Sequence, residues 1–471
     1  MKINFVTLKQ IKNWLNLLCI IAIIYFAFVL LHSEVYRFNP QYLVDNSIFK
    51  DRDFSVIVKE IKSPKLNLSA YLFEEHSNPI VSVSFTFLNS GSAYDASSRN
   101  GEAQILSAMI TAGAGKYDMK KFQSILEQKA IGINFFSDYD SISGVLKFIK
   151  KDMDIATNLF NLSITSPRIE DKYLEQTKNL IISNIKYQME QVDSSLYVQS
   201  LSTLYGNHPY GRNPYGNIKH LSNIKRHHIR QFMKKYLALD NLIIGISGDI
   251  TEIEAKALID KMFSGLPEHK QGAPLSDVNI SFSAPTKHIT RSSLQNIGYF
   301  WASGPTRQSS DFYPIYIAAQ ILFGNGLGSR MYKKAREVEG LTYGVYGSLG
   351  ENDKISFISG EFSATPDKFS RLLHIIKDEW QKIGEEGITE QELEQTKNSL
   401  ISSHALRYAD VHNISNMLVY MQKEHLGLDF LQKRNDYIRN VNIEDVNNAT
   451  KKYFAHDNLR FITIGDSYTE E

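Results

Sequence analysis

The chain has 471 residues, of which 43% are hydrophobic and 22% charged, a balance typical of folded proteins and a length that suits two or three domains. Lys and Arg total 52 against 51 Asp and Glu, which argues against a nucleic-acid-binding protein because such proteins normally carry a basic surface. The single cysteine, Cys19, excludes an internal disulfide framework and a cysteine-based zinc site.

The N-terminal residues form a basic segment followed by an apolar one. Lys2, Lys9 and Lys12 precede residues 14–31, which are apolar apart from Asn16. As a helix, that run would span about 27 Å, close to the ~30 Å hydrocarbon core of a bilayer. The pattern predicts a membrane anchor with its N-terminus in the cytoplasm and the bulk of the chain in the periplasm or another extracytoplasmic space. A cleaved signal peptide is the alternative.

Beyond this segment, strand and helix patterns are mixed. Residues 81–87 alternate apolar and polar side chains, which predicts a strand buried on one face, and the β-branched run at 242–246 predicts another strand, closed by Gly248. Helical patterns occupy residues 101–112, 117–129, 150–165, 168–192 and 251–264. The expected fold class is therefore α+β, with a sheet covered by helices.

Three short strings recur in the same order at a nearly constant separation. They are AQIL at 103–106 and 319–322, LEQTKN at 174–179 and 393–398, and KKY with DNL at 234–242 and 451–459, with offsets of 216, 219 and 217 residues. Chance similarity between helix-forming segments would not produce a shared offset. The chain is therefore predicted to contain two tandem homologous domains of roughly 215–220 residues each.

The expected domain boundaries follow from composition. Gly and Pro residues among polar ones at 264–287 indicate an interdomain linker. We assign residues 1–12 to a cytoplasmic N-terminus, 13–31 to a transmembrane helix and 32–54 to a linker. The first repeated domain is assigned to residues 55–266, an interdomain linker to 267–287 and the second repeated domain to 288–471.

From about residue 55 to the C-terminus, the chain resembles the pitrilysin/insulinase metallopeptidases, the inverzincins. The resemblance rests on the paired domains, on Ser90-Gly91-Ser92 before a helix that opens at Asn100-Gly101-Glu102-Ala103, and on His208-Pro209-Tyr210-Gly211, which we interpret as scaffold. In that family, the helix carries the zinc motif H-x-x-E-H.

The corresponding helix keeps the family's frame from Gly101 to Met109 but none of its metal chemistry. The resemblance places Gln104 and Ala108 at the two histidine positions, Ser107 at the glutamate that acts as general base, and Asn184 at the third zinc ligand. An amide, a methyl group and a hydroxyl cannot replace imidazole and carboxylate ligands. No two of the 13 histidines lie three or four residues apart, so no helical turn offers a replacement pair. We expect no metal in this chain.

The second domain carries a different family feature. Glycines 324, 326 and 328 precede Arg336 and Tyr343, which are seven residues apart. In the resembling enzymes, an arginine and a tyrosine at this spacing bind the substrate backbone and stabilise its oxyanion, and one such donor is worth roughly 2.7–4 kcal/mol. Each residue alone also suits a structural role, as a turn, a solvated arginine or a half-buried tyrosine. Their combination favours Gly324, Gly326 and Gly328 as substrate-binding residues, with Arg336 and Tyr343 acting in trans.

Three functions remain open. The leading hypothesis is a subunit that is inactive alone, like the alpha-type partner of two-subunit processing peptidases. It would pair with a homologue that carries H-x-x-E-H and zinc, and it would help to enclose a peptide or unfolded-protein substrate bound as an added strand. The alternatives are a non-proteolytic scaffold, as in respiratory-complex core subunits, and a self-sufficient metallopeptidase.

Overall fold

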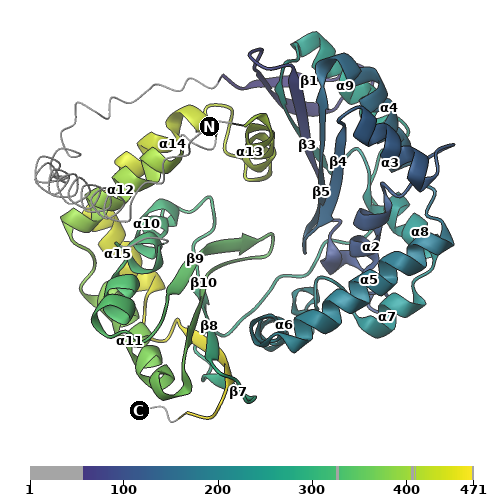
Figure 1. Ribbon diagram of the computed structural model, residues 1–471. Coiled ribbons are helices and arrows are strands. Elements are labelled where there is room, and N and C mark those ends of the chain that lie inside the picture. Colours follow the sequence, from purple (N-terminus) through teal and green to yellow (C-terminus); the bar gives the residue numbers. More distant parts are fainter. Residues whose placement is uncertain (1–56, 325–327, 405–407, 409, 469–471) are drawn as a thin grey trace, which may run out of the picture. The chain divides into compact units, whose positions relative to one another are not determined.

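The computed structural model describes residues 57–468, apart from 325–327, 405–407 and 409 (Figure 1). Two sheets, each covered by helices, account for the strands in this part of the chain. The α+β class predicted from the sequence is therefore confirmed.

The predicted transmembrane helix is not supported. Among the described residues, no helix is both long and apolar enough to span a bilayer. The two 20-residue helices, at Asp171–Glu190 and Pro366–Glu385, are amphipathic and carry charged residues along their length. The segment 13–31 itself lies outside the described residues. The structure therefore supports neither the predicted anchor nor the extracytoplasmic location that was deduced from it.

The first sheet has the strand order β1-β2-β6-β3-β5-β4. Its strands are β1 (Lys59–Lys62), β2 (Ser69–Glu74), β3 (Ile80–Leu88), β4 (Gly132–Ser137), β5 (Ser141–Ile149) and β6 (Leu242–Gly248). All neighbours are antiparallel except β2 and β6, which run parallel. Strand β4 therefore forms one edge of the sheet.

The helices described in the first half are α2 (Glu102–Met109), α3 (Met119–Gln128), α4 (Met153–Thr165), α5 (Asp171–Glu190), α6 (Val192–Tyr205), α7 (Ile218–Asn223), α8 (Arg226–Tyr236) and α9 (Glu252–Phe263), with the short turns η2 (Ser92–Tyr94), η3 (Lys150–Asp152) and η4 (Pro209–Gly211). Helices α2, α3, α4, α5 and α9 match the predicted ranges within a few residues, whereas α6, α7 and α8 were not predicted. Local chemistry fixes several ends. Thr251 and Glu254, for example, form a reciprocal capping box that begins α9.

The second sheet has the order β7-β11-β8-β10-β9. Its strands are β7 (Lys287–Thr290), β8 (Asn296–Ser303), β9 (Val345–Asn352), β10 (Ile355–Ala364) and β11 (Arg460–Gly465). The helices are α10 (Phe312–Phe323), α11 (Pro366–Glu385), α12 (Glu390–His404), α13 (Val411–Lys423), α14 (Phe430–Arg439) and α15 (Ile443–Tyr453), with a π-helical segment η5 (Tyr332–Val338). Here β7 and β11 are the parallel pair. This order repeats that of the first sheet without β1.

The repeated strings make the same contacts in both halves. Lys178 in α5 and Lys397 in α12 are buried, and each bonds to the glutamate three residues before it, at 2.8 and 2.9 Å. Asn241 and Asn458 each donate to the carbonyl oxygen of the tyrosine that ends the preceding helix, at 2.9 and 2.7 Å. The strings therefore recur where a buried polar group needs a fixed partner.

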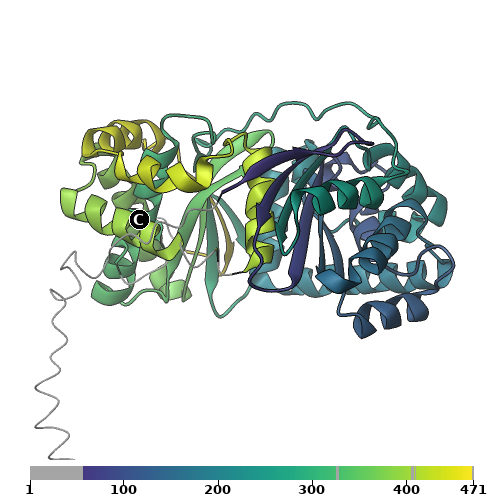
Figure 2. The ribbon, with the colours of Figure 1, turned by 90° about the horizontal axis from the view of Figure 1, so that it is seen from above.

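One helix of each half packs on the sheet of the other half (Figure 1 and Figure 2). Helix α13 contacts β2, β3 and β6, and α6 contacts β8 and β11. Under α13, the hydroxyl groups of Ser82 and Ser84 bond to Ser415 at 2.9 and 2.7 Å. The expectation that residues 81–87 form a strand buried on one face is therefore wrong. Strand β3 is buried on both faces because a helix from the distant half covers the polar side.

Candidate functional site

Helix α2 begins at a turn that only glycine can make. Gly101 has φ 119°, in the left-handed region, and a Cβ there would lie 2.4 Å from Leu221. The carboxylate of Asp95 accepts hydrogen bonds from the backbone N–H groups of Gly101 (2.6 Å) and Ala103 (2.9 Å). Burial raises the pKa of Asp95 to about 7, against the opposing effect of these hydrogen bonds. The family's frame is thus retained for reasons of backbone geometry.

The four zinc-site positions carry side chains that do not fit a metal. The Oε1 atom of Gln104 accepts from Ser137 in edge strand β4 at 3.1 Å. The buried hydroxyl of Ser107 donates to the carbonyl of Ala103 in its own helix at 3.0 Å. Ala108 and Asn184 are exposed, and neither offers a carboxylate or an imidazole. The polar groups on α2 are used within the fold, so zinc chemistry is not assigned to this helix.

Arg336 and Tyr343 come together at the start of the second sheet's edge strand. The Nη1 atom of Arg336 donates to the backbone carbonyl of Tyr343 at 3.1 Å, and the guanidinium lies over the ring of Tyr332 at 4.9 Å. The side chain of Arg336 is exposed, and Tyr343 is 78% exposed. The hydrogen bond and the contact with Tyr332 restrict the orientation of the Arg336 side chain. Because a guanidinium group has five N–H donors, others remain available for a ligand.

The segment that carries this pair is anchored to the body of the second half. Arg330 binds the carboxylate of Glu392 in α12 through two nitrogens, at 2.7 and 2.9 Å, and the carbonyl of Gly387 at 2.9 Å. Burial opposes ionisation of Glu392, but the hydrogen bonds from Arg330 prevail and lower its pKa to about 2. Arg330 therefore helps to hold η5, and with it Arg336, in place.

The predicted glycine segment is described only in part. Gly326 lies outside the described residues. At Gly324, an added Cβ would lie 2.4 Å from the carbonyl oxygen of Gln320, so packing against α10 explains this glycine. At Gly328, no atom lies within 4 Å of an added Cβ. Their role in substrate binding stays a prediction.

A polar cluster around the buried Asp140 joins the two halves, and the sequence did not predict it. The backbone N–H of Asp353 donates to Asp140 Oδ2 at 3.1 Å, and the hydroxyl of the buried Tyr210 donates to Asp140 Oδ1. Lys423 of α13 pairs with Asp353 at 3.0 Å. Burial, followed by the nearby charge of Asp353, raises the pKa of Asp140 to about 6. No local motif signals this cluster, because Asp140 and Asp353 are 213 residues apart.

Family comparisons cover most of the described chain. Residues 71–217 match the insulinase model (peptidase family M16), and residues 223–400 match the model for the peptidase M16 inactive domain. The chain belongs to the insulinase family of peptidases. This membership agrees with the paired α+β halves and with the retained frame of α2.

Some of the proteins similar to this chain are described as inactive-type members of this family, and others are named uncharacterized zinc proteases. A protein from Helicobacter pylori named "Non-peptidase homolog YmxG" is 23% identical over 394 residues, which are 83% of this chain and 90% of that protein. A solved structure described as the peptidase M16 inactive domain from Pseudomonas fluorescens has a TM-score of 0.82 at 22% identity and covers 88% of this chain and 99% of its own. A chain of Complex III2 from Candida albicans has a TM-score of 0.68 at 13% identity and covers 87% of this chain and 96% of its own. The insulinase-family protein described here is thus an inactive-type peptidase homologue.

Proposed function

We propose that this insulinase-family protein is the non-catalytic subunit of a two-chain zinc peptidase. In this proposal, a homologue with an intact H-x-x-E-H helix supplies the metal and the general base. This chain supplies Arg336 and Tyr343 and helps to enclose the peptide. The observation that carries the proposal is the contrast between a helix without metal ligands and an exposed Arg336 whose guanidinium is held beside the likewise exposed Tyr343.

The chemistry of the pair suits a peptide carbonyl. A guanidinium and a phenol both donate hydrogen bonds, and their donation strengthens as a carbonyl oxygen gains negative charge. Stacking on Tyr332 and the bond to the Tyr343 carbonyl restrict Arg336 before any substrate binds, which reduces the entropy lost on binding.

The position of the pair suits a peptide that adds to a sheet. Tyr343 lies two residues before β9 (Val345–Asn352), whose outer edge has no partner strand in the part of the chain that the structure describes. An extended peptide paired with this edge would gain main-chain hydrogen bonds and pass beside Arg336 and Tyr343. Arg336, Tyr343 and the edge strand β9 would therefore bind the same extended peptide.

The test is cleavage of a fluorogenic peptide by the co-purified pair of subunits. The double variant Arg336→Gln with Tyr343→Phe should lower kcat/KM by roughly 10²-fold or more, which is the loss typical for removal of an oxyanion donor. The two subunits should still co-purify. Arg230→Gln with Tyr215→Phe is the matched control, because Arg230 is also exposed and also donates to one backbone carbonyl. Equal activity of the two double variants would exclude the donor role. An H-x-x-E-H partner that never co-purifies would favour the non-proteolytic scaffold.

A further inference from the structure

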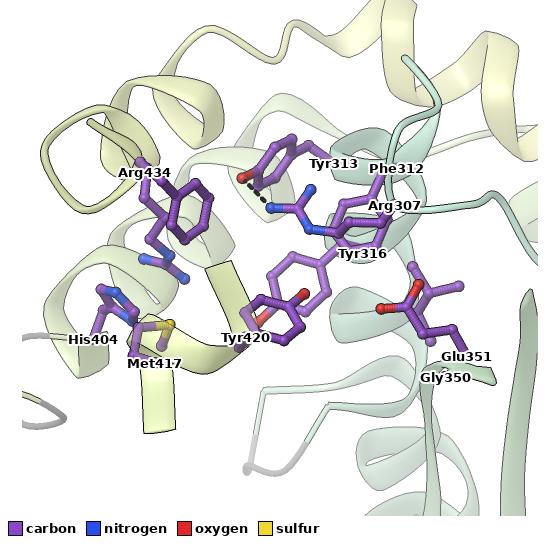
Figure 3. Close-up of a pocket in the computed structure, with 12 residues that line it drawn as sticks. Arg307, Phe312, Tyr313, Tyr316, Gly350, Glu351, His404, Met417, Tyr420 and Arg434 are labelled. Atoms are coloured by element: carbon purple, nitrogen blue, oxygen red, sulfur yellow. Dashed lines mark hydrogen bonds between the residues drawn. The ribbon is translucent and has the colours of Figure 1, made fainter. Parts of the chain in front are cut away.

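A cavity of about 330 Å³ lies within the second half (Figure 3), and neither Arg336 nor Tyr343 lines it. Its walls come from α10, β9, α12, α13 and α14 and from the loop that carries Arg307. Ligand sites commonly begin at about this volume. With liquid water at ~30 Å³ per molecule, the cavity has the volume of about eleven waters, which suits a ligand of about a dozen non-hydrogen atoms.

A buried arginine in this cavity lacks a partner for its charge. Arg307 is 8% exposed, and its guanidinium lies over the ring of Phe312 at 4.2 Å and near the ring of Tyr313 at 5.0 Å. One Nη atom donates to the Tyr313 hydroxyl at 2.9 Å, while the buried Nε–H has no acceptor. No carboxylate of the described residues forms an ion pair with Arg307. A buried cation without a counter-charge is costly, so the site favours an anion.

A second cation reaches the same cavity from another element. Arg434 of α14 is also 8% exposed and donates to the carbonyl of Leu400 and to Asn435 Oδ1, both at 3.1 Å. Figure 3 shows the two arginines with the ring of Tyr420 in the same pocket. The only carboxylate on the described wall is Glu351, and burial raises its pKa. The charge of Arg307 acts on both Glu351 and Glu424, but burial is the largest effect on each carboxyl and raises its pKa on balance.

The remaining walls are apolar and aromatic. Phe430, Met417 and Leu349 line the cavity together with the rings beside Arg307. Such walls can bury the flat apolar part of a ligand. The few polar groups, which here are the arginines, would then set the orientation of the ligand.

We propose that this cavity binds a small free organic acid, with its carboxylate on the guanidinium of Arg307 and a flat apolar body among the aromatic side chains. Met417 and Tyr420 lie on α13, the helix that packs on the first sheet, so an occupant would also stabilise the contact between the halves. This site does not depend on the peptidase role proposed above.

The test is calorimetric titration of the full chain with hydrocinnamate, with hydrocinnamamide as the uncharged analogue of the same shape. The acid should bind and raise Tm, and the amide should bind about tenfold more weakly or worse because it lacks the charge. Equal binding of acid and amide, or no binding of the acid at millimolar concentration, would overturn the proposal. Tighter binding of a blocked dipeptide with a free C-terminal phenylalanine would do the same, because it would make the site a peptide-end groove.

Variants separate the site from the fold. Arg307→Gln should abolish binding of the acid, whereas Arg439→Gln, at an exposed arginine of the same half, should leave it unchanged. Because Arg307→Gln could destabilise the protein, Met417→Trp provides a second route: it fills the cavity, keeps both arginines, and should also abolish binding. Glu351→Gln removes the competing carboxylate and should strengthen binding. Unchanged affinity in a folded Arg307→Gln and in Met417→Trp would refute the site.

Discussion

Gly245 in β6 marks the point where α13 meets the first sheet, and its replacement tests this contact between the halves. A Cβ at position 245 would lie 2.3 Å from the carbonyl oxygen of Ser415 and 2.8 Å from the Cβ of Leu418. Carbon atoms in good contact are about 3.5–4.0 Å apart, so α13 would have to retreat by about 1 Å. Both obstacles belong to α13 itself, and no flexible side-chain end can give way instead.

The magnitude follows from the contacts that such a retreat disturbs. Overpacking a buried site typically costs about 1–3 kcal/mol, and each weakened bond from Ser415 to Ser82 or Ser84 adds about 0.5–1.5 kcal/mol. We therefore expect Gly245→Ala to destabilise the protein by about 3 kcal/mol. Residues 56–471 form one compact unit, and at an unfolding entropy of about 2.1 cal/mol/K per residue a loss of this size lowers Tm by roughly 3–4 °C.

The assay is thermal unfolding with hydrogen exchange of α13. Gly132→Ala is the matched control, because Gly132 also lies in a strand but its added Cβ would meet nothing closer than 3.9 Å. The control should stay within about 0.5 kcal/mol of the parent chain. If Gly245→Ala and Gly132→Ala unfold at the same temperature and α13 exchanges equally slowly in both, the packing of α13 on β6 is refuted.

The other predictions concern packing and pH. Leu418→Ala, at a fully buried position of α13, should cost about 2–5 kcal/mol in chemical denaturation. The pKa of Glu392 is about 2 in the fold and 4.5 in the unfolded chain, so its stabilisation is present above pH 4.5 and is lost toward pH 2. Arg330→Met should weaken this acid dependence without removing it, because the hydrogen bonds from Thr389 to Glu392 remain, and unfolding curves at a series of pH values measure the change. The pKa of Asp140 is raised from 3.8 to about 6, so its stabilisation is present below pH 3.8 and is lost as pH rises through about 6. Asp140→Asn should make the free energy of unfolding less dependent on pH across that range. An unchanged dependence in this variant would contradict the raised pKa of Asp140.

The repeat was the part of the fold that the sequence specified best. Shared strings at a shared offset predict two related halves, and the paired roles of Lys178 and Lys397 explain why those residues recur. Helices α2, α3, α4, α5 and α9 were predictable for a similar reason, since apolar periodicity and caps such as Thr251 act within a few residues. The packing of α13 on the polar face of β3 was not predictable. Ser82 and Ser84 alternate with apolar residues, as in a strand with one face in solvent, and their partner Ser415 is more than 330 residues away.

The candidate site also has a part that the sequence predicted and a part that it did not. Gln104, Ser107, Ala108 and Asn184 could be placed by a frame that is local to the chain, and the structure adds the partners that occupy the first two. The proximity of Arg336 to Tyr343 could also be inferred from their spacing. The cavity around Arg307 and Arg434 could not, because its walls come from elements spread over more than 120 residues and no sequence pattern joins them.

The most direct test of the central claim is the zinc content of the purified chain, measured together with its peptidase activity, alone and with an H-x-x-E-H homologue. The account predicts no bound zinc and no cleavage by the isolated chain, with both appearing only in the mixed complex. Stoichiometric, tightly bound zinc in the isolated chain, with peptide cleavage that survives removal of every homologue, would contradict it.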